Sequence, residues 1–340
     1  MAQAWLGPFS VRHLAVSDPE TMRGSRGTCA DSARSRRWRR TAAVSLLSGV
    51  VLAAACHLAT VAFALPLGAV GGIGFSGASA GVRTRRRGDL ALRREGPVSI
   101  SEVRTEVRGE EGTESFRRFF LDAEGREISP WHDLPLSADA EGEYFMVTEI
   151  PKMTKPKMEI ATKEPANPIA QDTKKGKLRD YHGPIFWNYG YLPQTWEDPT
   201  VKHPELGVFG DNDPVDVVEI GSRAHSQGEI VRVKVLGALA MIDSGELDWK
   251  VIAVATDDPA AAEISDIGDL EAKMPGVVSG IREWFRWYKT PDGKGLNAFG
   301  FGEEALARSA TLEVIEETQG HWKRLRSGDG DSQGLWTGTA

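Results

Sequence analysis

The stretch Gly210-Asp211-Asn212-Asp213-Pro214-Val215-Asp216 places three carboxylates within six residues. Carboxylates this close repel one another, so the arrangement is costly unless a cation compensates. On a regular strand, Asp211 and Asp213 would face one way and Asp216 the other. The three side chains converge only if the backbone turns, and Pro214 blocks ladder pairing and fixes a bend. We therefore predict a sharp acidic turn that leads into a strand.

The turn offers only oxygen ligands, without His or Cys, which indicates a hard ion such as Mg²⁺ or Mn²⁺. Taken alone, the segment fits a solvated acidic turn better than a metal site, because a solvated turn is the commoner meaning of an isolated Asp-x-Asp. An EF-hand loop would need Gly at its sixth position and Glu at its twelfth, where this sequence has Asp216 and Ser222. The EF-hand is therefore excluded.

A second acidic cluster, Asp243-Ser244-Gly245-Glu246-Leu247-Asp248-Trp249-Lys250, lies between two apolar segments. Asp248 and Lys250 are two residues apart, so they project from the same face of a strand. Such a pair is either a plain surface ion pair or a metal ligand beside a phosphate ligand. The presence of two such clusters favours a metal site.

The charge of the chain is unevenly distributed. Residues 1–95 contain fourteen Arg, no Lys and five acidic residues, and the whole chain carries −7, so residues 96–340 carry −16. An acidic body repels nucleic acid and attracts divalent cations. The two cysteines, Cys29 and Cys56, both lie in the basic region. A disulfide scaffold and a thiolate zinc site are therefore excluded from the body.

The basic N-terminal region has the features of a targeting presequence. No Asp, Glu, Lys or Arg occurs in residues 41–82, and residues 42–64 are apolar and long enough to span a bilayer. We predict a signal-like segment at 34–64 and a transit-like segment at 65–95. This bipartite pattern is typical of proteins delivered to complex plastids. The alternatives are a retained membrane anchor and mitochondrial delivery.

Residues 96–326 are predicted to fold as one domain, and the Gly/Ser-rich residues 327–340 to form a flexible tail. Apolar, β-prone segments at 144–147, 229–241 and 249–255 predict strands. Helical spacing appears later, at 277–288 and 305–325. Strands followed by helices predict an α+β fold, with a small OB-like five-stranded antiparallel β-barrel flanked by C-terminal helices. We expect Trp284, Phe285 and Trp287 to be packing residues.

Six separated motifs together resemble the family I soluble inorganic pyrophosphatases of the eukaryotic type, including plastid members. The segments that carry the resemblance are Glu149-Ile150-Pro151, Lys157-Met158-Glu159-Ile160, Gly176-Lys177-Leu178-Arg179, Gly210–Gly221, Ala240–Ala253 and Trp284–Lys294. The similarity runs from about Val103 to Arg326, and Trp131–Leu136 resembles the N-terminal extension of eukaryotic members. The resemblance implies hydrolysis of diphosphate to two orthophosphates with Mg²⁺ as cofactor, and it favours a homodimer weakly.

The resemblance also implies roles for individual residues. Asp213 would act as the general base, and Tyr189 would donate to the substrate. The implied metal ligands, either direct or through water, are Asp211, Asp216, Asp243, Asp248, Glu149 and Glu159. The implied phosphate-binding residues are Lys157, Arg179, Tyr189, Lys250, Tyr288 and Lys289.

The chemistry agrees with these roles. Two metals that share one water lower its pKa, so hydroxide forms near neutrality and attacks phosphorus directly. Lys and Arg then stabilise the charge on the leaving phosphate. No covalent enzyme intermediate is needed.

Two other functions are considered beside this interpretation, and one residue departs from the family pattern. The motifs do not define substrate length, so longer polyphosphates or triphosphates are an alternative substrate. A non-catalytic barrel that binds single-stranded nucleic acid is disfavoured, because such proteins need a positive groove. The departure is Ile185, which stands where the eukaryotic family has a tyrosine assigned to leaving-group protonation. Tyr181 lies nearby at a different spacing.

Overall fold

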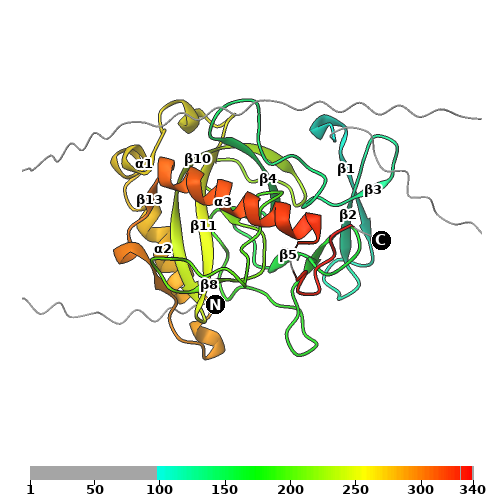
Figure 1. Ribbon diagram of the computed structural model, residues 1–340. Coiled ribbons are helices and arrows are strands. Elements are labelled where there is room, and N and C mark those ends of the chain that lie inside the picture. Colours follow the sequence, from blue (N-terminus) through cyan, green and yellow to red (C-terminus); the bar gives the residue numbers. More distant parts are fainter. Residues whose placement is uncertain (1–97, 330, 339–340) are drawn as a thin grey trace, which may run out of the picture. The chain divides into compact units, whose positions relative to one another are not determined.

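The acidic turn connects strands β8 (Phe209–Gly210) and β9 (Asp216–Glu219) in a computed structural model that describes residues 98–329 and 331–338. The predicted presequence lies outside the described residues. The other strands are β1 (Arg104–Arg108), β2 (Arg117–Leu121), β3 (Glu127–Ile128), β4 (Glu143–Ile150), β5 (Met158–Ile160), β6 (Ile169–Gln171), β7 (Asn188–Tyr191), β10 (Ile230–Asp243), β11 (Glu246–Ala255), β12 (Ala298–Phe299) and β13 (Leu306–Ala307). The α-helices are α1 (Ile267–Lys273), α2 (Val277–Trp287) and α3 (Arg308–Ser327). All strands except the short β12 and β13 precede the helices, and the predicted α+β class is confirmed (Figure 1).

The strands form two sheets. In the smaller sheet, β1, β2, β6 and β5 pair antiparallel in that order, and β3 pairs with β2. In the larger sheet the pairings run β10–β4–β7–β9–β11 and return from β11 to β10. The β9–β11 pairing is parallel. The prediction that the five strands are wholly antiparallel is therefore wrong at this pair, where the intervening β10 serves as the crossover that parallel strands require.

A bulge in β10 directs side chains into two separate apolar clusters. Val231, Val233 and Val235 belong to the cluster that includes residues of α3, and strict alternation would keep odd-numbered residues on that face. The register shifts between Val235 and Gly237, and from there the odd-numbered Leu239 belongs to the other cluster. One bulge thus lets a single long strand contribute to both cores.

Each helix covers the larger sheet with an apolar face. Helix α3 lies across β10 and β11 (Figure 1) and buries Val314 and Ile315. Helix α2 buries Val278, Ile281 and Phe285, at the spacing of three and four that predicted it. None of the helices in residues 98–329 is long and apolar enough to cross a bilayer.

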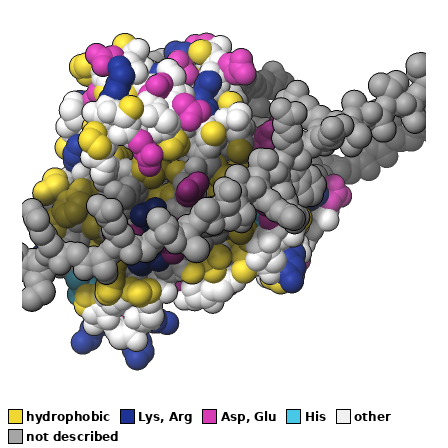
Figure 2. Space-filling view, turned by 90° about the vertical axis from the view of Figure 1, so that its left-hand side faces the viewer, with side chains coloured by type: hydrophobic (Ala, Val, Ile, Leu, Met, Phe, Trp, Pro, Cys, Tyr) yellow, Lys and Arg dark blue, Asp and Glu magenta, His cyan; other side chains and the backbone are white. Residues whose placement is uncertain are grey.

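The exposed end of α2 corrects one expectation. Trp287 is 54% exposed, because it lies on the face of α2 opposite the buried Val278, Ile281 and Phe285. Its indole N–H donates to Glu283 at 3.3 Å. On the molecular face seen in Figure 2, acidic and basic side chains occur with apolar side chains among them, as is ordinary for a protein surface.

The segment after α3, predicted as a flexible tail, makes specific contacts with the domain. Leu335 is buried in the larger of the two apolar clusters. The Trp336 N–H donates to the Thr162 carbonyl at 2.9 Å, and the Trp336 carbonyl accepts a hydrogen bond from His132 Nε2 at 2.9 Å. The His132 Nδ1 atom accepts from the indole of Trp322 at 2.9 Å. Leu335 and Trp336 therefore attach this segment to both the smaller sheet region and α3.

We predict that Leu335→Ala lowers the free energy of unfolding by about 2 kcal/mol or more, because it removes a buried side chain. Urea unfolding followed by fluorescence measures the change. The matched control is Leu296→Ala, at a leucine that is 51% exposed and should cost little. Equal stabilities of the two variants would mean that the tail is loose in solution.

Candidate active site

All thirteen residues implicated by sequence line one cavity of about 960 Å³. They come from strands β4, β5, β7, β9, β10 and β11, from the loops between strands, and from the C-terminal end of α2. Residues up to about 140 positions apart in sequence, Glu149 and Lys289, are thus brought together. Further acidic and basic residues, among them Asp172, also line the cavity.

The acidic turn is shaped by its backbone. Asn212 has a positive φ of 77°, a left-handed conformation that Asn tolerates better than most residues. The Asp213 N–H donates to Asp211 Oδ1 at 3.0 Å. Glu197 holds the turn through its main chain, accepting from the Asn212 N–H and donating to the Asp213 carbonyl, each at 2.9 Å. A Cβ on Gly210 would lie 2.4 Å from the Glu197 carbonyl, so this close approach requires glycine.

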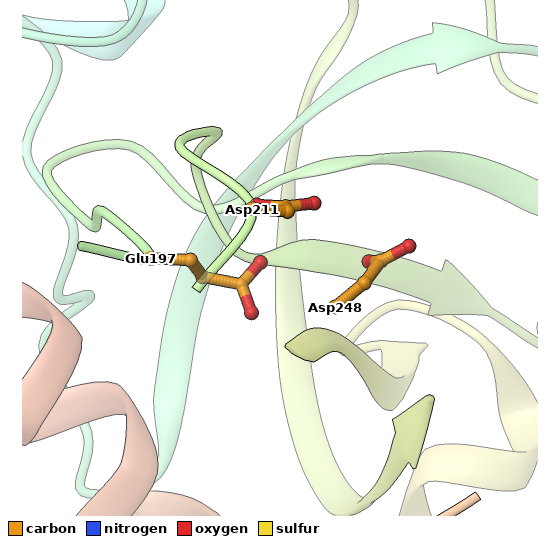
Figure 3. Close-up of side chains that lie close together, drawn as sticks. All are labelled: Glu197, Asp211 and Asp248. Atoms are coloured by element: carbon orange, nitrogen blue, oxygen red, sulfur yellow. The ribbon is translucent and has the colours of Figure 1, made fainter. Parts of the chain in front are cut away.

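Glu197, Asp211 and Asp248 form the tightest acidic group of the described residues, with oxygen atoms within 4.8 Å of one another (Figure 3). Glu197 Oε1 accepts from the Trp249 N–H at 2.8 Å, whereas Oε2 is buried without a hydrogen-bond partner among the described residues. Burial raises the pKa of Glu197, and the charges of Asp211 and Asp248 raise it further. An oxygen-only group with an unpartnered, buried carboxylate oxygen fits a hard divalent cation.

The sequence analysis missed Glu197. It lies in Gln194-Thr195-Trp196-Glu197-Asp198-Pro199, which has neither the density of acids nor the strand alternation that drew attention to the other clusters. Its place in the site depends on the long-range backbone contact with the acidic turn. A local pattern could not have revealed that contact.

Lys250 is the central cation of the cavity and is only 2% exposed. Its ammonium donates to Asp216, to Asp248 and, at 2.9 Å, to the Tyr189 hydroxyl. The Tyr189 hydroxyl in turn donates to Asp216. Burial opposes the charge of Lys250, but Asp216 and Asp248 more than compensate and raise its pKa. Strands β7, β9 and β11 are therefore linked by one charged network.

Two carboxylates of the cavity, Asp248 and Asp213, bind protons more tightly than usual. Burial raises the pKa of Asp248 to about 7, with Lys250 opposing the rise and Asp216 adding to it. Partial loss of hydration within the cavity raises the pKa of Asp213 to about 6, and the charge of Asp216 adds to this rise while Lys157 opposes it. Both shifts result from carboxylates crowded in a low-dielectric cavity, and a bound cation would favour the charged forms.

A second ion-pair group lies at the C-terminal end of α2. The Lys289 ammonium and the Tyr288 hydroxyl both donate to Asp243, the latter at 3.3 Å. Burial would raise the pKa of Asp243, but the hydrogen bonds from Lys289 and Ser244 outweigh it and lower the pKa. Asp243 is therefore ionised and carries its own counter-ions.

The smaller sheet contributes a third group. Lys157 and Arg179 both pair with Asp172, with the Lys157 contact at 3.4 Å, and Lys157 also contacts Glu159. The Lys157 N–H donates to the Arg179 carbonyl at 3.0 Å, so the two cations are fixed on adjacent extended segments. Asp172, which the sequence analysis did not select, thus orients both cations.

Glu149 closes the cavity on the side of β4. Its Oε1 atom accepts from the Ile160 N–H at 2.6 Å, and the side chain is nearly fully buried. Burial raises the pKa of Glu149, and the charge of Asp216 adds to this effect. The carboxylate is therefore available for a cation or a cation-bound water.

Comparisons with known proteins give a consistent result. Residues 146–323 match the family model described as inorganic pyrophosphatase. Soluble inorganic pyrophosphatase 6, chloroplastic, from Arabidopsis thaliana is 45% identical over 295 residues, which cover 84% of this chain and 95% of the relative. Soluble inorganic pyrophosphatase 1, chloroplastic, from Chlamydomonas reinhardtii is 50% identical over 231 residues, covering 68% of this chain and 82% of the relative.

Solved structures agree with the sequence matches. The crystal structure of type I inorganic pyrophosphatase from Toxoplasma gondii is similar with a TM-score of 0.63 and 47% identity, covering 66% of this chain and 99% of that chain. A truncated vacuolar soluble pyrophosphatase from Trypanosoma cruzi, solved in complex with PPi, has a TM-score of 0.64 and 42% identity. That match covers 70% of this chain and 95% of the other.

We predict that Glu197→Gln weakens binding of Mg²⁺ or Mn²⁺ about tenfold or more, because it removes one charge from the acidic group while keeping the acceptor for the Trp249 N–H. Isothermal titration calorimetry measures the dissociation constant. Glu246→Gln is the matched control, since Glu246 lines the cavity outside the tight group. Unchanged binding in Glu197→Gln would exclude Glu197 from the cation site.

Proposed function

The chain belongs to the inorganic pyrophosphatase family and hydrolyses pyrophosphate to phosphate, and we propose that it does so as a Mg²⁺-dependent enzyme through the residues of the cavity. The observation that carries this proposal is the arrangement of charge in one cavity. A group of carboxylates, of which Glu149 and Asp248 are buried, lines the same cavity as Lys157, Arg179 and Lys289. Such a cavity suits an anion that arrives together with divalent cations.

The carboxylates would hold the metal ions. Asp211, Asp216 and Asp248 would be direct ligands, and Asp243 would join them when substrate is present. Glu149 and Glu159, which line the same cavity, would hold metal-bound waters. When bound, Mg²⁺ neutralises phosphate charge and lowers the pKa of water. Glu197, with its unpartnered oxygen, would complete this set.

Asp213 would accept the proton of the attacking water. It follows Asp211 in the turn, and its raised pKa of about 6 lets it exchange a proton near neutral pH. The main-chain contacts between the turn and Glu197 fix its position. A rigid base of this kind avoids reorganisation during the reaction.

The cations and phenols would bind the two phosphate groups. Lys157 and Arg179 would hold one side of the substrate, and Lys289 with Tyr288 the other. Lys250 and Tyr189 lie between the metal ligands and would stabilise charge that develops on the leaving phosphate. Each of these groups already pairs with a carboxylate, so binding requires exchange of one anionic partner for another.

We interpret the closed series of pairings β10–β4–β7–β9–β11 as the small OB-like barrel expected from the sequence. In support, each of these five strands pairs with two others of the set. The parallel pair β9–β11 distinguishes it from a wholly antiparallel barrel.

We predict that Asp213→Asn lowers the turnover of Mg-pyrophosphate about a hundredfold or more, because the base is lost. Asp216→Ala should lower it at least as much by removing a metal ligand. Phosphate release from pyrophosphate measures both effects. Asp257→Asn is the control, at a side chain that is 71% exposed and outside the cavity. Turnover unaffected by both cavity substitutions would contradict the assigned mechanism.

We also propose delivery to a complex plastid, with residues 1–95 as the bipartite presequence and residues 96–326 as the enzyme domain. Two similar proteins are named chloroplastic, which supports this destination. The order of a signal-like and a transit-like segment supports the bipartite route.

We predict that residues 1–100 direct a fluorescent protein to the plastid in a cell that has a complex plastid. Without residues 34–64 the same fusion should remain outside the secretory pathway, because it lacks the apolar segment. Fluorescence microscopy with plastid and mitochondrial markers distinguishes the outcomes. Mitochondrial fluorescence, or a ring of fluorescence at a surrounding membrane, would support the alternatives instead.

A further inference from the structure

Two phenols that line the cavity, those of Tyr181 and Tyr191, have no role in the scheme above. The chain contains five tyrosines, and four of them line the cavity, namely Tyr181, Tyr189, Tyr191 and Tyr288. The hydroxyls of Tyr189 and Tyr288 donate to carboxylates, and the hydroxyl of Tyr191 is sealed from solvent. The Tyr181 hydroxyl differs from all three, because it has no hydrogen-bond partner among the described residues and is not sealed.

The backbone places Tyr181 beside the phosphate-binding cations. Its N–H donates to the Lys155 carbonyl at 2.8 Å, and the neighbouring Asp180 forms a β-bridge with Pro156. Tyr181 is two residues after Arg179 on this extended segment, so the two side chains project from the same face. Tyr181 therefore faces the part of the cavity that Arg179 lines.

The ring of Tyr181 is fixed by aromatic contacts. It packs edge-on against Trp284, with ring centroids 4.9 Å apart, and against Tyr288, at 5.8 Å. The residue is only 6% exposed. Burial raises its pKa well above the usual value, so the hydroxyl stays protonated and can donate a hydrogen bond. A fixed, protonated and unpartnered donor that is open to a cavity suits an anionic ligand.

The tyrosine that the eukaryotic family has in this region is replaced here by Ile185. Ile185 is fully buried in the apolar core, and its backbone pairs with Met153 and Thr154 at 2.6 and 3.1 Å. Its side chain therefore cannot reach the cavity, and it does not line it. The path of the chain between Arg179 and Asn188 presents Tyr181 to the cavity instead.

We propose that Tyr181 is a substrate-contacting residue, whose hydroxyl donates a hydrogen bond to a phosphate oxygen of bound pyrophosphate alongside Arg179. The inference rests on the proposed function of the cavity and adds one residue to it. Because the contact is with the ground-state anion, it strengthens binding of non-hydrolysable diphosphates as well as substrate.

The test compares Tyr181→Phe with the wild-type full-length enzyme. Phenylalanine keeps the ring packing against Trp284 and removes only the hydroxyl. We expect kcat/KM for Mg-pyrophosphate to fall about tenfold or more, as for loss of a hydrogen bond to a charged group. The inhibition constant of methylenediphosphonate should rise by a similar factor. The control is Tyr144→Phe, at the tyrosine outside the cavity.

A Tyr181→Phe enzyme that binds methylenediphosphonate as tightly as the wild type overturns the proposal, whatever its turnover. Unchanged melting temperatures of both variants establish that a loss of affinity is not a folding defect. Failure of the broader assignment has a different signature, because a wild-type enzyme that releases no phosphate from pyrophosphate would contradict the function of the whole cavity.

Discussion

The buried ammonium of Lys250 is the interaction on which the site depends. A charge removed from water is costly unless it is closely paired, and here the partners are Asp216, Asp248 and the Tyr189 hydroxyl. Lys250 stands opposite Asp216 in the parallel β9–β11 register. A slip of one residue would turn Lys250 toward the apolar face that carries Trp249 and Val251. Strand register and the charge network therefore require each other.

Two backbone devices make that register compatible with a closed arrangement of strands. The bulge at Val235 and Gly237 lets β10 contribute side chains to both apolar clusters. Gly237 also lets β13 and α1 pack closely against β10, because a Cβ at this position would lie 2.1 Å from Ile267 and 2.4 Å from the Leu306 carbonyl. The acidic turn supplies the second device through the left-handed Asn212. The bulge thus serves the two apolar clusters, and the left-handed residue shapes the acidic turn.

Patterns among neighbouring residues predicted the features that depend on the geometry of a single strand or helix. Alternation placed Asp248 and Lys250 on one face of β11, and helical spacing identified the buried face of α2. The parts that were missed depend on distant contacts. Glu197 joins the site through main-chain hydrogen bonds to the acidic turn. The burial of Leu335 was not predicted, because the Gly/Ser-rich composition of the C-terminal residues indicated a flexible tail. The parallel pair β9–β11 likewise reflects topology rather than the residues of either strand.

The same carboxylates that suit the cavity to catalysis oppose folding. Burial and mutual repulsion raise the pKa values of Glu149, Glu197 and Asp211, so each resists ionisation in the folded protein. Lys250 lowers this cost for two other carboxylates, and the apolar clusters on both sides of β10 and β11 offset the remainder. Binding of cations relieves the repulsion directly, and thereby couples folding stability to the presence of the cofactor. A protein with cations bound among these carboxylates is therefore expected to be more stable than the same protein without them.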